Sequence, residues 1–369
     1  MEKSIQELSQ ELKSYIKEYD HQSFVAHWSY YSNAQIRTGQ SLKDLPSPVR
    51  QVIYLMTLYH SNDFGGTKKF QAVGEDFQYI VTLLNKIEGY YINKTPDGST
   101  IPADDKYSEK LFISNITFLN YYLNAPLSYF EQDVERITET FKYFEWFIQE
   151  QTGLQTRDFI DFFYLITNLE IEIYENHFNR KYNKQEHALI LKIRDNPVSL
   201  TIAEKIQITN LAENRVLELG ISISRIKEHI TQEKVDKLLV LFTMIRAENQ
   251  EYLYYTDTCQ YLTKPILLSG PEHISCIYSK QLISAIYEYL FELCKAVDPN
   301  GRKVLMRREN YLKAKTQEVF HNFFGSNSRI YSNYYVNSSE KDLLILQGRN
   351  PAEPALKNQF NINQKSHSI

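Results

Sequence analysis

Hydrophobic positions recur at helical spacing along most of the chain. In the first segment Ile5, Leu8, Leu12 and Ile16 lie three or four residues apart, with Glu, Gln and Lys between them. This is the pattern of an amphipathic helix. The same periodicity predicts further helices over residues 49–59, 76–91, 107–124, 127–151, 156–178 and 183–194. We therefore expect packed helices over most of residues 1–296.

Residues 198–255 predict three more helices with a tight link at Gly220. Such a unit is typical of a structural bundle, but also of a helix-turn-helix reader of DNA. Its second helix would carry Arg225 and Lys227 together with Glu228, so the basic character needed for phosphate contact is weak. We interpret this segment as a structural helix bundle.

From Thr263 the pattern changes from helix to strand. Residues 265–268 and 274–278 flank a turn at Gly270 and predict a short β-hairpin, and residues 284–296 are helical again. A turn-rich cluster at residues 298–301 closes this part. Beyond it the sequence predicts a helix over 307–324 and strands over 329–336 and 341–346, separated by a polar turn at 337–339.

The expected fold class is mainly α, with a multi-helix N-terminal array followed by a small α-β-β element. The expected organisation is a helical domain over 1–197, a helical domain with a short hairpin over 198–297, the α-β-β element over 304–349 and a polar tail over 350–369. The tail contains two prolines and few apolar residues. It is therefore expected to pack poorly.

Charge and cysteine content narrow the function classes. The 41 Lys and Arg residues against 45 Asp and Glu residues give a net charge of -4. The chain as a whole therefore has no electrostatic footprint for nucleic acid, and any such contact has to be local. Cys259, Cys276 and Cys294 form no metal-binding or disulfide pattern, which fits a reducing cytoplasm. No apolar run approaches the ~20 residues that span a bilayer, so no membrane partner is expected.

Aromatic and histidine residues offer weaker signals. The 28 tyrosines include the pairs at 30–31, 90–91 and 121–122, which could form stacking platforms for bases. Tyrosine also packs with its ring buried and its hydroxyl wet, and we assign the tyrosines to packing. The histidine pairs His21 and His27, and His177 and His187, lack the i, i+4 spacing of a zinc-binding pair.

The C-terminal order of helix, strand, polar turn and a strand that opens with Asp and continues as Leu-Leu-Ile-Leu resembles the start of a PD-(D/E)XK nuclease core. The preceding residues 264–293 and the segment SPVRQVIYLMTLYHS are similar to parts of large bacterial helical proteins that end in such a core. The resemblance implies a restriction-endonuclease-like element. It also implies that Glu318 and Asp342 are metal ligands and that Mg²⁺ is the cofactor.

The second half of such a core is missing from the sequence. Carboxylates are hard ligands for Mg²⁺, and the family completes its site with a Glu-x-Lys motif on a third strand. Glu353 and Lys357 have the wrong spacing for that motif. The closest formal match, Asn363 to Lys365, places an amide where the carboxylate belongs. The metal site is therefore expected to be incomplete and the chain to be inactive as a nuclease.

Two hypotheses follow. The first is a helical scaffold with an incomplete, inactive nuclease-like module, related to bacterial proteins of nucleic-acid processing or defence, which is either a truncated gene product or a degenerate copy used for binding. The second is a non-enzymatic helical protein that serves protein interaction or structure, in which Glu318 and Asp342 are ordinary surface residues. Nucleic acid, a protein partner and self-association through the unpaired edge of strand 341–346 are the partners considered.

Overall fold

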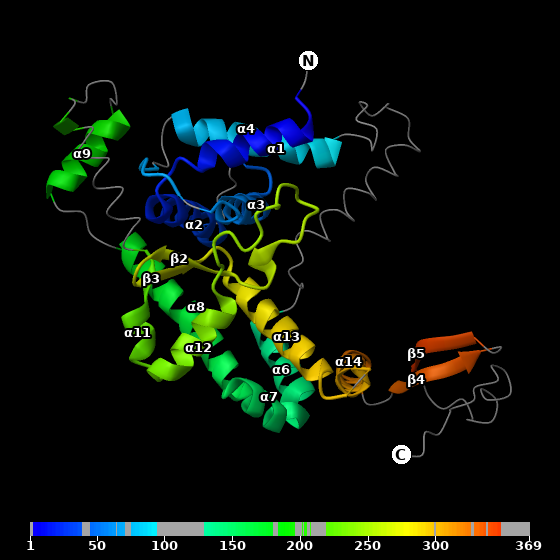
Figure 1. Ribbon diagram of the computed structural model, residues 1–369. Helices are drawn as coiled ribbons and strands as arrows, with labels where there is room; N and C mark the ends of the chain where they lie inside the picture. Colours follow the sequence, from blue (N-terminus) through cyan, green and yellow to red (C-terminus); the bar gives the residue numbers. More distant parts are fainter. Residues whose placement is uncertain are drawn as a thin grey trace. The chain divides into compact units, whose positions relative to one another are not determined.

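The computed structural model is mainly helical, as predicted, with two small antiparallel sheets (Figure 1). It describes residues 3–38, 45–63, 65–70, 75–93, 129–179, 184–195, 201, 203–204, 207, 219–298, 300–325, 328–336 and 339–347. The chain divides into two compact units. Unit 1 comprises Met1–Val134 and Ile148–Leu290, and unit 2 comprises Glu135–Phe147 and Phe291–Ile369. The domain limits expected from the sequence stay predictions.

Unit 1 begins with four helices, drawn in blue to cyan in Figure 1: α1 (Ile5–Ile16), α2 (His21–Thr38), α3 (Pro48–His60) and α4 (Glu75–Asn93). The predicted apolar stripe of α1 is confirmed, because Leu8, Leu12 and Ile16 are all buried. Ser4 and Glu7 form a reciprocal capping box that satisfies two backbone N–H groups at the start of α1. The predicted helices over 49–59 and 76–91 are α3 and α4.

Helix α2 was not predicted, and its buried face explains why. That face carries Ser23, Ser29, Ser32 and Asn33 between its apolar residues, so hydrophobic periodicity is interrupted. Two of these side chains bond to distant parts of the chain: the hydroxyl of Ser23 accepts from the backbone N–H of Phe70 at 3.0 Å, and the amide of Asn33 donates to the carbonyl oxygen of Cys276 at 2.8 Å. Tertiary contacts therefore stabilise a helix that its own hydrophobic pattern does not predict.

Two predicted helices are confirmed as α8 (Thr156–Asn179) and α9 (Lys184–Asp195). The single helix predicted over 127–151 is divided into α6 (Phe130–Phe141), the 3₁₀ turn η1 (Lys142–Phe144) and α7 (Glu145–Thr152). The helix predicted over 107–124 lies outside the described residues, as does the tail over 350–369.

Of the three helices predicted over residues 198–255, the described residues 219–255 contain two, and the segment before them lies largely outside the described residues. Residues 221–222 form strand β1 (Ile221–Ser222), followed by the short α11 (Ile223–Lys227) and by α12 (Gln232–Phe242). No α-helix covers 243–255. The backbone N–H of Met244 instead donates to the carbonyl oxygen of Ile266 at 2.8 Å, so the chain leaves its helix to pair with a strand.

The predicted hairpin is confirmed as β2 (Ile266–Gly270) and β3 (His273–Cys276). Strand β1 pairs with β3 on its other side, which gives a three-stranded antiparallel sheet of order β1-β3-β2. Sequence pattern alone missed β1 because two residues are too few to show alternation. Helix α13 (Ser279–Lys295) follows the sheet and begins five residues before the predicted start at 284.

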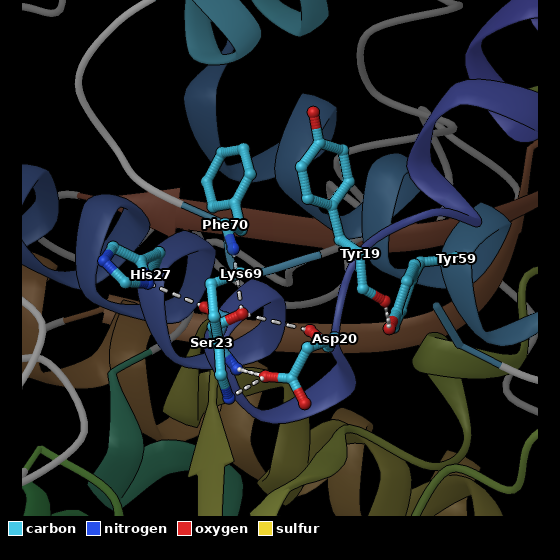
Figure 2. Close-up of polar contacts among 7 residues, drawn as sticks. All are labelled: Tyr19, Asp20, Ser23, His27, Tyr59, Lys69 and Phe70. Carbon is cyan, nitrogen blue, oxygen red and sulfur yellow. Dashed lines mark hydrogen bonds and ion pairs between the residues drawn. The ribbon is translucent and has the colours of Figure 1, made fainter. Parts of the chain in front are cut away.

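A short extended segment after α3 closes the core of unit 1 (Figure 2). Its backbone pairs with the α1 to α2 junction: Gly66 N donates to Lys17 O at 2.8 Å, and Asp20 N donates to Lys68 O at 2.7 Å. The hydroxyl of Ser23 accepts from the backbone N–H of Phe70 at 3.0 Å. This pairing buries the ring of Phe70 completely among the core aromatics.

The packing role assigned to the tyrosines is confirmed for the central ones. Tyr19, Tyr54, Tyr59, Tyr252 and Tyr261 are among the largest fully buried side chains. Their hydroxyls are satisfied internally where hydrogen bonds are described, as in the 2.9 Å bond from Tyr59 to the carbonyl oxygen of Tyr19 (Figure 2). Burial raises the pKa of Tyr59 to about 12, so its hydroxyl keeps its proton at neutral pH.

The C-terminal part of unit 2 has the predicted order of helix, strand and strand. It contains α14 (Arg302–Phe324), β4 (Ser328–Val336) and β5 (Ser339–Gln347), drawn in orange tones in Figure 1. Strands β4 and β5 form an antiparallel hairpin whose register runs from Ser328 opposite Gln347 to Val336 opposite Ser339. For these two strands the description covers the backbone alone.

Candidate nucleic-acid interface

Glu318 lies on the exposed side of α14. Its carboxylate pairs with the ammonium of Lys315, one turn earlier, at 3.2 Å. Lys315 also binds Glu135 at 2.9 Å, and these two carboxylates raise the pKa of its ammonium. The carboxylate that the resemblance assigns to a metal is therefore held in this structure by a cation of its own helix.

The other residues of the predicted metal site are placed less completely. Asp342 lies on β5, between Lys341, which is paired with Tyr334, and Leu343, which is paired with Ser332. Asn363 and Lys365 lie outside the described residues. In the part of the chain that the structure describes, no group of three or more His, Cys, Asp or Glu side chains could hold a metal ion. A Mg²⁺ site at Glu318 and Asp342 stays a prediction.

Helix α14 concentrates positive charge in a chain of net charge -4. It carries six Lys or Arg residues and two Glu residues, which gives the helix a net charge of +4. Lys315 is neutralised by its carboxylate partners. The guanidinium of Arg307 has no carboxylate partner among the described residues. Because the chain has no overall positive charge, a nucleic-acid contact has to be local, and α14 is a local basic segment of the kind such a contact needs.

Arg307 stacks on an aromatic ring contributed by another part of unit 2. Its guanidinium carbon lies 3.6 Å from the ring centroid of Tyr143, which belongs to the η1 turn and is 50% exposed. The ammonium of Lys142 lies 5.3 Å from the centroid of the same ring. Both distances lie within the ≈ 6 Å range of cation–π attraction. Tyr143 is thus a half-exposed ring with two cations beside it.

A second exposed aromatic follows one turn after Tyr143. The indole of Trp146, near the start of α7, is 61% exposed. On α14, Lys303 precedes Arg307 by four residues and so lies on the same helix face. We call Lys142, Tyr143, Trp146, Lys303 and Arg307 the Tyr143–Arg307 patch. All five residues belong to unit 2.

One acidic residue moderates the charge of the patch. Glu139 pairs with Lys142 at 2.5 Å and raises the pKa of the Lys142 ammonium, so that cation is partly neutralised. Neither Lys303 nor Arg307 has an ion pair with a described carboxylate, and the contact described for the Arg307 guanidinium is the one with the Tyr143 ring. The free positive charge of the patch therefore lies mainly on α14, where Arg307 stacks on Tyr143.

Sequence reasoning missed the patch. Tyr143 was counted with the packing tyrosines, and Trp146 falls at a helical spacing that is equally typical of a core residue. Lys303 and Arg307 lie far away in the sequence, and only packing of α14 against the η1 turn brings a cation onto the ring. The available signal was the basic composition of residues 302–315.

No described helix combines the length and apolar character needed to cross a membrane. No family model, curated protein or solved structure matches the chain. A function for this protein therefore has to be argued from its own residues.

Proposed function

We propose that this protein is a helical scaffold whose C-terminal unit binds single-stranded nucleic acid through the Tyr143–Arg307 patch, without cleaving it. The stacking of Arg307 on the half-exposed ring of Tyr143, beside the exposed indole of Trp146, carries this proposal. Sequence-independent binding of single strands uses the same combination, in which bases stack on aromatic rings while cations follow the backbone phosphates.

The magnitudes make the patch sufficient for measurable binding. Base stacking on an aromatic side chain contributes roughly 1–3 kcal/mol per base. Two exposed rings, Tyr143 and Trp146, lie one helical turn apart and could take two bases. Lys303 and Arg307 would neutralise phosphates, so binding would weaken as salt concentration rises.

We propose no cleavage because the sequence supplies too few ligands for a catalytic Mg²⁺ ion. The α14, β4 and β5 order agrees with the start of a PD-(D/E)XK core, which supports a nuclease-like ancestry related to bacterial nucleic-acid processing or defence. Glu318 is already paired with Lys315, and the sequence offers no Glu-x-Lys strand after Asp342. Two carboxylates hold Mg²⁺ weakly and do not position the attacking water.

The two tryptophans of the chain make a direct test available. Trp28 is 1% exposed and Trp146 is 61% exposed, so iodide quenches mainly the fluorescence of Trp146. A 15-nucleotide oligo(U) or oligo(dT) that stacks on the patch should quench that emission and protect the remainder from iodide. The buried Trp28 supplies an internal reference that the oligonucleotide leaves unchanged.

Affinity measurements with variants complete the test. Trp146→Ala should weaken binding of a labelled oligonucleotide by roughly 5- to 150-fold, which corresponds to the loss of one stacked base. Tyr129→Ala is the matched control, because Tyr129 is 76% exposed but lies in unit 1. No binding at low salt, or an equal loss in the two variants, would refute the proposal.

A second candidate function, protein interaction through self-association, is favoured by a different observation. Leu312, Val319 and Phe323 share one face of α14 and are 48%, 54% and 80% exposed. Contiguous exposed apolar residues are typical of protein interaction sites. If the oligonucleotide experiments fail, sedimentation equilibrium of the wild-type chain and of Phe323→Ser decides this alternative: a concentration-dependent mass that the variant loses supports it.

A further inference from the structure

Arg246 lies in the segment that follows α12, and two backbone hydrogen bonds fix its position. Met244 N donates to Ile266 O at 2.8 Å, and Ala247 N donates to His60 O at 2.8 Å. Ala247 has a φ of 58°, a left-handed conformation that is uncommon for a residue with a Cβ. The backbone beside Arg246 is therefore held in a strained conformation by its neighbours, a feature that clusters at functional sites.

The guanidinium of Arg246 is surrounded by aromatic and imidazole rings rather than by carboxylates. Its central carbon lies 4.8 Å from the ring centroid of Tyr59, and its Nη1 lies 3.4 Å from Nδ1 of His21. The rings of His21 and His60 lie 5.3 Å apart in an edge-to-face arrangement. We call Arg246, His21, Tyr59 and His60 the Arg246 cluster; all belong to unit 1.

Both histidines of the cluster are neutral, and their hydrogen bonds fix their tautomers. Nε2 of His21 lies 2.7 Å from the carbonyl oxygen of Leu268 and carries the proton, which leaves the Nδ1 lone pair facing Arg246. Nδ1 of His60 donates to the carbonyl oxygen of Met56 at 2.8 Å. Burial and the charge of Arg246 lower the pKa of His21, and burial lowers the pKa of His60 to about 3.

One edge of the guanidinium has no acceptor. The Nε and Nη2 atoms of Arg246 are buried, and no described residue accepts a hydrogen bond from them. Asp20, the neighbour of His21 in the chain, uses its carboxylate to bind Ser23 N and Lys69 Nζ, each at 2.9 Å (Figure 2). Buried N–H donors that no described residue accepts from are destabilising, so this edge of the guanidinium is suited to a negative partner.

The glycines after α3 let the chain lie directly against this cluster. A Cβ on Gly65 would lie 2.8 Å from the hydroxyl of Tyr59 and 2.9 Å from Nη1 of Arg246. Contacts that short exclude a side chain unless its neighbours move. Gly65 therefore packs its bare backbone directly against the Tyr59 hydroxyl and Nη1 of Arg246.

We infer that the Nε and Nη2 edge of Arg246 is a binding site for a small oxyanion, carried by a carboxylate or a phosphate group. Two parallel N–H donors match the two oxygens of such a group and form a bidentate, charge-assisted pair. His21 accepts from Nη1 of Arg246 and, being neutral, does not compete for the anion. This site is independent of the proposed nucleic-acid function, since its residues lie in unit 1.

Isothermal titration calorimetry of the full chain tests the site with inorganic phosphate, acetate and chloride at matched ionic strength. Phosphate, acetate or both should bind saturably, whereas chloride should not bind. The difference in affinity between phosphate and acetate identifies the preferred group. Arg246→Met should lower the affinity at least ~10-fold, the value of one lost charged hydrogen bond. Lys69→Met is the matched control, because Lys69 is a cation of the same region that is paired with Asp20.

Stability gives a second readout that does not depend on detecting heat. Without anion, Arg246→Met should be at least as stable as the wild type, because it removes two buried N–H donors that no described residue accepts from. Saturating phosphate should then stabilise the wild type relative to the variant. Titration of the wild type should also shift the NMR signal of His21 Nδ1. Absence of saturable binding and of this shift, or an equal anion response in Arg246→Met, would overturn the inference.

Discussion

The guanidinium carbon of Arg307 lies 3.6 Å from the ring centroid of Tyr143, so a cation of α14 covers part of a ring presented by the η1 turn. The ring of Tyr143 remains 50% exposed beside this cation. One contact thus joins the two chemistries that single-stranded nucleic acids require.

Replacing Arg307 by Gln should weaken oligonucleotide binding to a similar degree for all base compositions, because a phosphate contact carries no sequence information. The slope of log K against log salt concentration should become smaller by about 0.7, the value expected for one phosphate contact on a single strand. Fluorescence anisotropy at salt concentrations from about 25 to about 200 mM measures both the affinity and the slope. An unchanged slope would show that Arg307 does not contact phosphate.

The purified chain should not cleave DNA or RNA with Mg²⁺ or Mn²⁺, because in-line attack needs the missing third-strand carboxylate and lysine. Asp342→Ala should therefore leave both oligonucleotide binding and the absence of cleavage unchanged. Gel assays on single- and double-stranded substrates measure this. Metal-dependent cleavage that disappears in Asp342→Ala would instead establish a complete site and direct attention to Asn363 and Lys365.

Acid should destabilise unit 1 through His60. Its pKa falls from an ordinary 6.5 to about 3 in the folded protein, so between these values the unfolded chain binds more protons than the folded one. Stability is complete above pH 6.5 and falls as the pH decreases toward 3. Lowering the pH from 7 to 5 should cost about 2 kcal/mol from this group.

The variant His60→Asn tests the assignment of that effect. Its amide can still donate to the carbonyl oxygen of Met56 but does not titrate in this range. Urea unfolding at pH 7 and pH 5 should show a smaller loss of stability in the variant than in the wild type. His21, whose pKa is also lowered, supplies the acid sensitivity that remains. Equal losses in the two proteins would exclude His60 as the source.

Gly66→Ala should strongly destabilise unit 1, because the added Cβ would lie 1.8 Å from the backbone oxygen of Glu18. The backbone pairing of Gly66 with the α1 to α2 junction holds the segment that leads to Phe70. The loss in free energy of unfolding should therefore be ~3 kcal/mol or more. Gly325→Ala is the comparison: its Cβ meets nothing within 4 Å, and only the φ of 80° is unfavourable, at about 1 kcal/mol. Thermal unfolding compares the two. Similar small losses would show that the junction tolerates displacement.

The amino-acid sequence by itself determined the elements that depend on local interactions or on a single buried face. Helix α1 follows from Leu8, Leu12 and Ile16, which need only one buried face. The β2 and β3 hairpin follows from two apolar runs around a turn at Gly270. The order of α14, β4 and β5 follows from helical periodicity succeeded by two strand-like runs, although α14 begins at Arg302 and the predicted helix began at 307.

Tertiary structure decided what depends on partners distant in the sequence. Helix α2 buries Ser23 and Asn33, whose side chains gain hydrogen bonds to the distant backbone of Phe70 and Cys276. The residues after α12 are not helical, because the backbone N–H of Met244 donates to the carbonyl oxygen of Ile266 at the edge of β2. Neither preference is visible in a local pattern, since each is a gain in hydrogen bonding that exists only after folding.

The two candidate sites belong to this second class. Tyr143 and Arg307 carry no motif that relates them, and neither do His21 and Arg246. Their spacings in the sequence are set by the helices and strands between them rather than by the chemistry they perform. Packing brings each guanidinium onto an aromatic ring, at 3.6 Å for Tyr143 and 4.8 Å for Tyr59. The sequence therefore supplies the residue types, and the fold alone brings them close enough to act together.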